Sequence, residues 1–179
     1  MTLKDYYFDQ TTDKGWLHGY IECYYSDKFS PLREKPIIML ELGVYRGKSI
    51  QLWNGWFKNA FIYGIDVSEE SIKKIENIPS VKGFLGDGYT MDMVNKFDDD
   101  FFDFIIEDGP HTLDSQIFAV KNWTRKLKKN GTLIIEDIQD ISHVGILIGN
   151  IPAGYAYKSI DMRSVKNRYD DIILEITKF

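Results

Sequence analysis

Five apolar runs alternate with amphipathic stretches along most of this sequence, and each run ends at or beside an acidic residue. With their acidic ends included, the runs cover residues 37–42, 60–66, 81–87, 101–108 and 132–137. Short apolar runs bounded by proline or glycine are typical of strands buried in a parallel sheet. Helical periodicity lies between or after them, at residues 48–57, 68–76, 112–127 and 141–151. This alternation predicts an α/β fold, an open parallel sheet with helices on both faces.

Two more apolar runs follow the alternating region. Residues 155–162 and 171–176 are joined by a polar segment, 163–170, which indicates a closing antiparallel pair. We therefore expect a Rossmann-like, mostly parallel sheet of seven strands. No internal repeat or linker suggests a second domain, so residues 1–179 are predicted to form one domain with a core at 36–179.

The first 35 residues are rich in aromatic side chains, and we interpret them as a helical cap segment. From Trp16 to Phe29 the aromatic and aliphatic positions recur with helical spacing. A helix with one aromatic face is expected to pack on the sheet, the commoner role, or to cover a bound cofactor. A contact between two copies of the chain is a further interpretation, which leaves a homo-oligomer open.

Acidic side chains gather at the predicted carboxyl ends of the strands. They are Glu41, Asp66, Asp87, Asp108, Glu136 and Asp137. In an open parallel sheet these strand ends share one edge, and ligands bind in the crevice outside it. Core strands rarely end in acids this consistently by chance, so the sequence predicts a ligand site at this edge.

A glycine loop follows the first strand, and the spacing of its glycines distinguishes between classes of ligand. The segment Glu41-Leu-Gly43-Val-Tyr45-Arg-Gly47-Lys-Ser49 places three residues between its glycines. A phosphate-binding P-loop needs four residues before Gly-Lys-Ser, and a dinucleotide loop needs glycine at position 45. The spacing instead resembles the S-adenosylmethionine (SAM) loop of class I methyltransferases. A carboxylate at Glu41 suits the sulfonium and amine of SAM and would repel a pyrophosphate.

Two further strand ends complete a predicted adenosine site. Asp66 follows Gly43 by 23 residues, close to the interval of roughly 20 at which an acid binds ribose hydroxyls. Its alternative role is an N-cap for the next helix, although Ser68 can supply that cap. Asp87 would reach the adenine amine. The cofactor candidates are Glu41, Gly43, Tyr45, Gly47, Ser49, Asp66, Val67, Asp87 and Gly88.

The fourth and fifth strand ends predict a metal and a base. Carboxylates that converge there, from Asp108, Glu136 and Asp137, repel one another unless a cation intervenes. An all-oxygen set of ligands suits Mg²⁺. His111 lies three residues past Asp108, where a neutral imidazole can take a proton from a substrate hydroxyl. Helix capping and solvated loops are the alternative roles for these acids.

Several short motifs together resemble the macrocin and mycinamicin sugar O-methyltransferases, a family of class I SAM-dependent enzymes. They are Thr12-Asp-Lys-Gly15, His18-Gly-Tyr20, Leu40-Glu-Leu-Gly43, Gly64-Ile-Asp66, Asp108-Gly-Pro-His111 and Ile135-Glu-Asp-Ile-Gln139. The resemblance implies Mg²⁺ held by Asp108, Glu136 and Asp137, and His111 as the base. It also implies that Asp13 and Lys14 lie near the cofactor, and that the acceptor is a sugar or another small hydroxylated molecule. Pro110 stands where the family usually has a small polar residue.

Composition and charge exclude several other classes of protein. A net charge of −5 and a pI near 5.2 disfavour a nucleic-acid partner. No run of 18 apolar residues and no apolar leader occurs, and the single cysteine, Cys23, allows no internal disulfide. We expect a cytoplasmic protein without a membrane partner. A P-loop-like nucleotide-binding enzyme and a SAM-binding regulatory protein without catalysis stay as alternatives.

Overall fold

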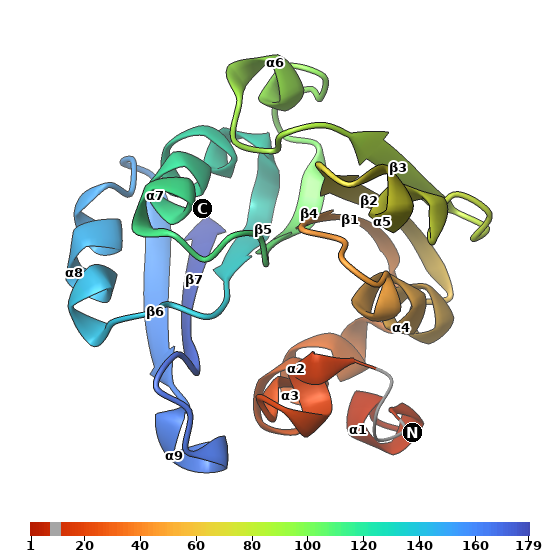
Figure 1. Ribbon diagram of the computed structural model, residues 1–179, viewed down its shortest axis with the longest axis horizontal. Coiled ribbons are helices and arrows are strands. Elements are labelled where there is room, and N and C mark those ends of the chain that lie inside the picture. Colours follow the sequence, from red (N-terminus) through yellow and green to blue (C-terminus); the bar gives the residue numbers. More distant parts are fainter. Residues whose placement is uncertain (8–11) are drawn as a thin grey trace.

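The computed structural model describes residues 1–7 and 12–179, and it contains one seven-stranded sheet (Figure 1). The strands are β1 (Pro36–Leu42), β2 (Asn59–Asp66), β3 (Val81–Leu85), β4 (Phe102–Glu107), β5 (Leu127–Ile135), β6 (Tyr155–Asp161) and β7 (Ile172–Lys178). Their order is β3-β2-β1-β4-β5-β7-β6. The first five are parallel, and β7 runs antiparallel to both β5 and β6. The predicted mostly parallel, seven-stranded fold is confirmed.

The helices between the strands follow the predicted alternation, with three differences. They are α4 (Lys48–Trp56), α5 (Glu69–Lys73), α6 (Met91–Val94), α7 (Leu113–Asn122), α8 (Ile141–Gly149) and α9 (Arg163–Lys166). The short α6, whose first turn Thr90 caps, was not predicted, and neither was α9, which lies in the segment expected to be a polar connection. The helix predicted to reach residue 127 ends at Asn122, and β5 begins at Leu127 instead of Thr132. The pairing of β5 with β4 shifts register along this early part, where Asn130 has a positive φ.

The N-terminal segment is helical but not one continuous helix. Its pieces are α1 (Leu3–Tyr6), α2 (Asp13–Trp16), a π-helical turn (Ile21–Tyr25), α3 (Ser26–Phe29) and a 3-10 turn (Ser30–Leu32). The helix predicted over residues 16–29 is wrong at its start, because Gly19 adopts a φ of 74°. A left-handed residue ends a right-handed helix. Residues 8–11 of the predicted cap segment lie outside the described residues.

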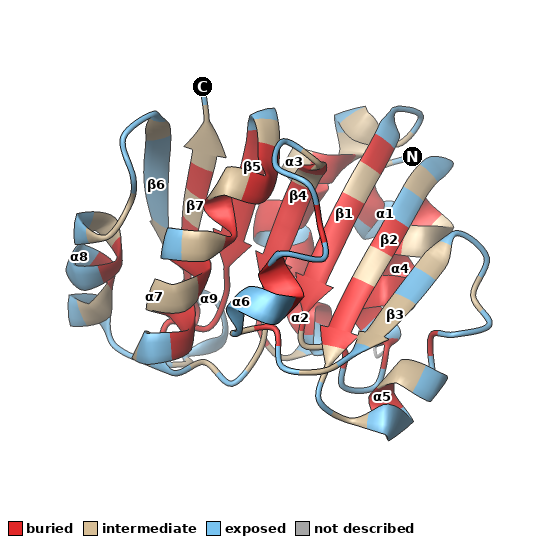
Figure 2. Cartoon of the chain, turned by 90° about the horizontal axis from the view of Figure 1, so that it is seen from above, coloured by how far each residue is buried: buried red, intermediate tan, exposed pale blue. Residues whose placement is uncertain are grey.

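Two apolar cores cover the two faces of the sheet (Figure 2). Side chains alternate along a strand, so Met39 faces the N-terminal segment and α4, whereas Leu40 faces α7 and α8. Most N-terminal aromatics lie in the first core; the Phe29 ring centroid is 5.3 Å from that of Trp53. Packing on the sheet is therefore their main role. Trp16, half exposed, is the exception.

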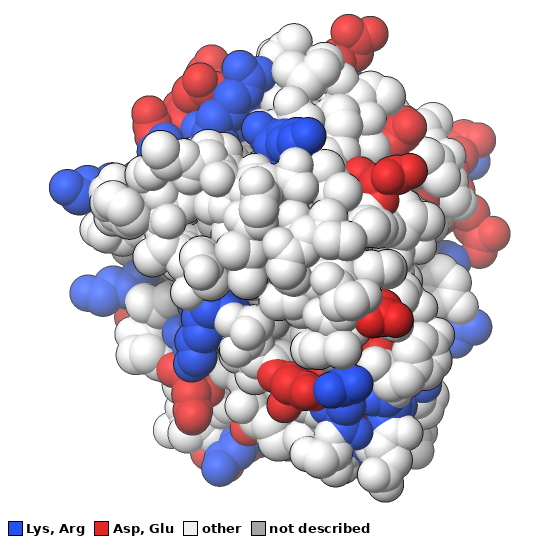
Figure 3. Space-filling view, turned by 90° about the vertical axis from the view of Figure 1, so that its left-hand side faces the viewer, with Lys and Arg blue, Asp and Glu red and all other residues white. Residues whose placement is uncertain are grey.

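On the face shown in Figure 3, which includes α8 and β6, uncharged side chains fill the central area and charged ones lie mainly around it. Ile141, Ile146 and Tyr157 are exposed there. Among the described residues, no helix combines the length and the apolar character that a membrane crossing requires. The carboxyl ends of the parallel strands open on another side of the molecule, where the predicted acids meet.

Candidate active site

A cavity of about 1440 Å³ lies at the carboxyl edge of the parallel strands. Most of the predicted cofactor residues line it: Asp13, Lys14, Gly43, Tyr45, Ser49, Asp66, Val67, Asp87 and Gly88. The proposed metal and base residues Asp108, His111, Glu136 and Asp137 line its other part. The topology therefore brings the two predicted groups into one space, as expected for strand ends that share an edge.

The glycine loop has the backbone conformation that only glycine tolerates at its start. Gly43 has a φ of 92°, and a Cβ added there would come within 2.0 Å of the Asp108 carbonyl oxygen. The loop thus passes directly against the end of β4. Gly47, which precedes α4, also has a positive φ, but it packs against Ile75 and does not line the cavity.

Asp66 holds this loop in place through its backbone. Its Oδ2 accepts hydrogen bonds from the amides of Val44 and Tyr45 at 2.8 and 2.9 Å, and its Oδ1 accepts one from the Ser68 amide at 2.8 Å. Ser68 in turn caps α5 with its own side chain. Asp66 therefore lies at the tip of β2 facing the cavity, and its contact with ribose hydroxyls stays a prediction.

Glu41 differs from its predicted position. The side chain is fully buried and does not line the cavity. Its oxygens accept hydrogen bonds from Ser49 Oγ at 2.6 Å and Trp53 Nε1 at 3.2 Å. Because it alternates with Leu42 along β1, it points toward the face that α4 covers. Burial raises the pKa of Glu41 to about 7, although the nearby ammonium of Lys14 acts in the opposite direction. Through its two hydrogen bonds, Glu41 therefore stabilises α4, the helix that follows the glycine loop.

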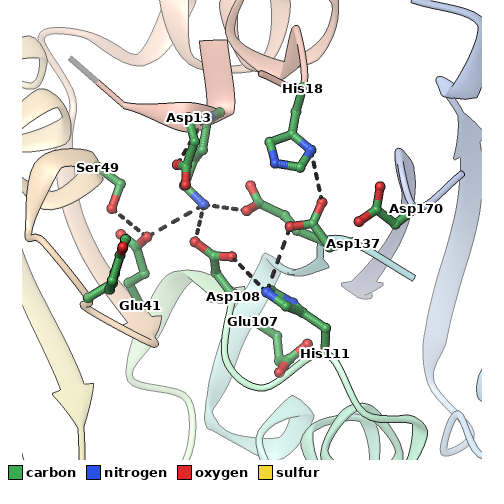
Figure 4. Close-up of polar contacts among 12 residues, drawn as sticks. Asp13, His18, Glu41, Ser49, Glu107, Asp108, His111, Asp137 and Asp170 are labelled. Carbon is green, nitrogen blue, oxygen red and sulfur yellow. Dashed lines mark hydrogen bonds and ion pairs between the residues drawn. The ribbon is translucent and has the colours of Figure 1, made fainter. Parts of the chain in front are cut away.

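The end of β4 and the end of β5 place an imidazole between two carboxylates (Figure 4). His111 Nε2 lies 3.9 Å from Asp108 Oδ1 and 3.8 Å from Asp137 Oδ2. Both His111 and Asp137 have positive φ values, a strained backbone that tends to occur at functional sites. Pro110 lines the cavity beside them without preventing this approach.

Glu136 is separated from that group, although sequence reasoning placed it among the metal ligands. It accepts hydrogen bonds from Lys14 Nζ and from the Tyr25 hydroxyl, so both of its oxygens already have partners. Adjacent residues at a strand end point in different directions, which is why Glu136 and Asp137 face different partners. Burial, together with Asp108 and Asp137, raises the pKa of Glu136 despite Lys14.

Lys14 lines the cavity and lies among three carboxylates. Its ammonium is 2.6 Å from Asp108 Oδ2 and 3.6 Å from Glu41 Oε1, in addition to its contact with Glu136. Burial alone would lower the pKa of Lys14, but the three carboxylates together raise it well above its ordinary value. The ammonium is therefore charged at neutral pH.

A second set of polar side chains, which sequence reasoning did not assign to the site, supports Asp137 from the other side. His18 Nδ1 lies 2.7 Å from Asp171 Oδ1 and 3.3 Å from Asp137 Oδ1. The Tyr20 hydroxyl donates to the same Asp137 oxygen at 2.6 Å. Burial and Asp137 raise the pKa of Tyr20, so this hydroxyl stays protonated. A usable signal existed for Asp171, since an acid that begins an antiparallel last strand falls at the same edge.

The donor groups fit a divalent cation. Oxygen and nitrogen atoms of Asp108, His111 and Asp137 lie within 4.8 Å of one another. Three carboxylates, those of Glu41, Asp108 and Glu136, contact the ammonium of Lys14, whereas Asp137 faces His18 and His111 instead, so carboxylates outnumber this ammonium. Burial and Asp108 raise the pKa of Asp137. A cation bound here would offset that repulsion between like charges, and carboxylate oxygens are ligands that Mg²⁺ prefers.

Comparison with solved structures defines the class of fold. MycE methyltransferase of the mycinamycin pathway, in complex with Mg and SAH (S-adenosylhomocysteine), superposes with a TM-score of 0.74 at 20% identity. The alignment covers 98% of this chain and 53% of that chain. A complex of MycE with Mg, SAH and mycinamycin VI gives a TM-score of 0.64 at 25% identity, over 75% of this chain and 38% of that chain. The fold is that of the Rossmann-like class I methyltransferases.

The family is shown by the sequence itself. A family described as "methyltransferase domain" matches residues 40–138, more than half of the chain, and the chain belongs to this family. It is 24% identical over 136 residues to the 8-demethyl-8-alpha-L-rhamnosyl tetracenomycin-C 2'-O-methyltransferase of Streptomyces olivaceus, covering 72% of this chain and 35% of that protein. It is 26% identical over 143 residues to the mycinamicin VI 2''-O-methyltransferase of Micromonospora griseorubida, covering 76% and 35%. The chain spans about a third of the length of these curated relatives.

Proposed function

We propose that the protein transfers a methyl group from SAM to a hydroxyl of a small, sugar-like acceptor. The observation that carries this proposal is the position of His111 between Asp108 and Asp137, in the same cavity as the Gly43 loop and Asp66. The relatives named above are O-methyltransferases of sugar-bearing compounds, and the MycE structures contain Mg and SAH. Both facts support the same chemistry for this chain.

In this proposal, one part of the cavity binds the cofactor, and the other part holds the cation and the general base. Bound SAM supplies the methyl group, and a divalent cation such as Mg²⁺ makes a nearby hydroxyl more acidic. Asp108 and Asp137 would hold that cation. A nitrogen that binds a metal cannot take a proton, so we assign Nε2 of His111 to the acceptor hydroxyl. His111 would then remove the hydroxyl proton while the oxygen forms a bond to the methyl carbon and the bond between that carbon and the sulfur of SAM breaks, which leaves SAH.

The cofactor half of the proposal is tested by titrating SAH into the protein by calorimetry, with Mg²⁺ and then with EDTA. We expect SAH to bind in both conditions, and ATP not to compete. If SAH binds in neither condition, the assignment of the Gly43 loop as a SAM site is wrong. Binding of ATP in its place would favour the nucleotide-binding alternative.

The catalytic half is tested by His111→Ala. We expect turnover on a panel of hydroxylated glycosides to fall by about 100-fold or more, the usual contribution of a general base, while SAH affinity stays unchanged. His143→Ala is the matched control, because His143 lies in α8 and does not line the cavity. Full turnover in the His111 variant would remove it as the base, and SAH binding without any turnover in the unchanged protein would favour a regulatory role.

A further inference from the structure

The Lys14 ammonium occupies the middle of the acidic group at the carboxyl edge. Lys14 lies in α2 and is only 2% exposed. Its partners come from three different strand ends: Glu41 from β1, Asp108 after β4 and Glu136 after β5. The dashed lines that meet beside Glu41 and Asp108 in Figure 4 mark these contacts. One buried cation from the N-terminal segment thus ties three strands together.

Two of these carboxylates are also predicted metal ligands. Lys14 Nζ donates hydrogen bonds to Oδ2 of Asp108 and to one oxygen of Glu136. The Tyr25 hydroxyl donates a hydrogen bond to the other oxygen of Glu136. Among the described residues, the carboxylate oxygens that face His111 are Asp108 Oδ1 and Asp137 Oδ2. A divalent cation that used Glu136 as a ligand would have to displace the ammonium, because both need the same oxygen and like charges repel.

We propose that Lys14 is an internal counter-ion that competes with the divalent cation for Asp108 and Glu136, which couples metal binding to the position of residues 12–18. This inference rests on the metal site of the proposed function and adds Glu136, the third ligand that the family resemblance implies. The coupling follows from the local contacts of α2, since Asp13, Trp16 and His18 on either side of Lys14 line the cavity. When the ammonium leaves Glu136, this wall of the cavity loses one of its attachments to the strand ends.

Competition predicts a gain of metal binding when the charge at position 14 is removed. In calorimetric titrations of Mg²⁺ without SAH, we expect Lys14→Met to bind Mg²⁺ roughly tenfold or more tightly than the unchanged protein, within the usual range of coupling between two ligands. A residue with a purely structural role would give weaker binding or no change. Lys14→Gln is the second variant. Its amide has no charge but can still donate hydrogen bonds to the buried carboxylates, which the methionine side chain cannot do.

The matched control is Lys126→Met. Lys126 is another buried lysine, at the opposite edge of the sheet, where it contacts Asp99 and the carbonyl oxygen of Phe97. We expect its substitution to leave Mg²⁺ affinity unchanged. Hydrogen exchange provides the second measurement: Mg²⁺ should speed amide exchange within residues 12–18 of the unchanged protein and have no such effect in Lys14→Gln.

Each outcome separates this inference from the proposed function. Tighter Mg²⁺ binding in the Lys14 variants alone supports the competition. Equal or weaker binding in those variants, with normal binding in the unchanged protein, overturns the competition and leaves the methyl-transfer proposal intact. No Mg²⁺ binding in any of the proteins overturns both the competition and the metal step, whereas SAH binding still decides the cofactor assignment.

Discussion

Glu107 is a buried carboxyl at the end of β4 that the proposed reaction does not use. It is fully buried and accepts a hydrogen bond from the Tyr89 hydroxyl through one oxygen. Its other oxygen, and Oε1 of Gln116, have no hydrogen-bond partner of normal geometry among the described residues. The Gly109 amide and the Gln116 side chain are nevertheless close enough to lower the pKa of Glu107 somewhat. Burial raises the pKa of Glu107 from 4.5 to about 7. The folded protein therefore favours the protonated form.

This shift predicts how Glu107→Gln changes stability with pH. Between pH 4.5 and about 7 the unfolded chain releases the proton more readily than the folded protein, so the unchanged protein loses stability as pH rises through this window. The glutamine amide cannot ionise and can donate where the proton did. We expect the variant to be more stable by about 3 kcal/mol at pH 8 and nearly equal at pH 4. Urea unfolding at the two pH values measures this, and an equal gain at both would point to packing instead of ionisation.

The loop between β1 and α4 is an element whose shape depends on one glycine. Gly43 combines a φ of 92° with a close approach to the Asp108 backbone, where neither atom can move without shifting a strand end. We expect Gly43→Ala to cost at least about 2 kcal/mol in unfolding free energy and to abolish SAH binding, because strain and overlap add.

Gly145 in α8 provides the matched control for that substitution. A Cβ there meets nothing within 4 Å. We expect Gly145→Ala to stabilise the protein by roughly 0.5–1 kcal/mol, through helix propensity alone, with unchanged SAH binding. Thermal unfolding and calorimetry check both variants. A well-folded Gly43→Ala protein that binds SAH normally would contradict the role given to this loop.

The elements that sequence reasoning predicted best are those with a local signal. Apolar runs and their acidic ends identified the strands, and the shared edge of parallel strands brought Asp108, His111 and Asp137 together. The direction in which each acidic side chain points at that edge could not be predicted from the sequence. Glu41 faces α4 because strand side chains alternate, and Glu136 turns toward Tyr25, a partner 111 residues away in the sequence. Such choices depend on tertiary packing.

At the scale of the whole molecule, the N-terminal segment and the sheet share their polar centre. Lys14, Tyr20 and Tyr25 all contact the acids at the end of β5. The Tyr25 hydroxyl satisfies a fully buried carboxylate, so its loss leaves that oxygen without a partner. The segment is therefore held by buried polar contacts as well as by its aromatic core, and the single domain over residues 1–179 stays a prediction.

This arrangement predicts a single cooperative unfolding transition. We expect the midpoints from circular dichroism and from tryptophan fluorescence to coincide in urea. Tyr25→Phe should lower both midpoints together, with a loss of about 1–3 kcal/mol for the unsatisfied carboxylate. An early fluorescence step, before the change in circular dichroism, would show that the N-terminal segment detaches first and would contradict a single domain.

The hydrogen bond between His18 and Asp171 joins residues 153 positions apart. Contacts of such separation form late, because the chain between them must be ordered first. During synthesis on the ribosome, the cofactor loop and the first strands can assemble while residue 171 has yet to appear. A nascent chain paused before that point would lack the carboxylate that anchors His18, so the part of the cavity beside His18 and Asp137 is completed last.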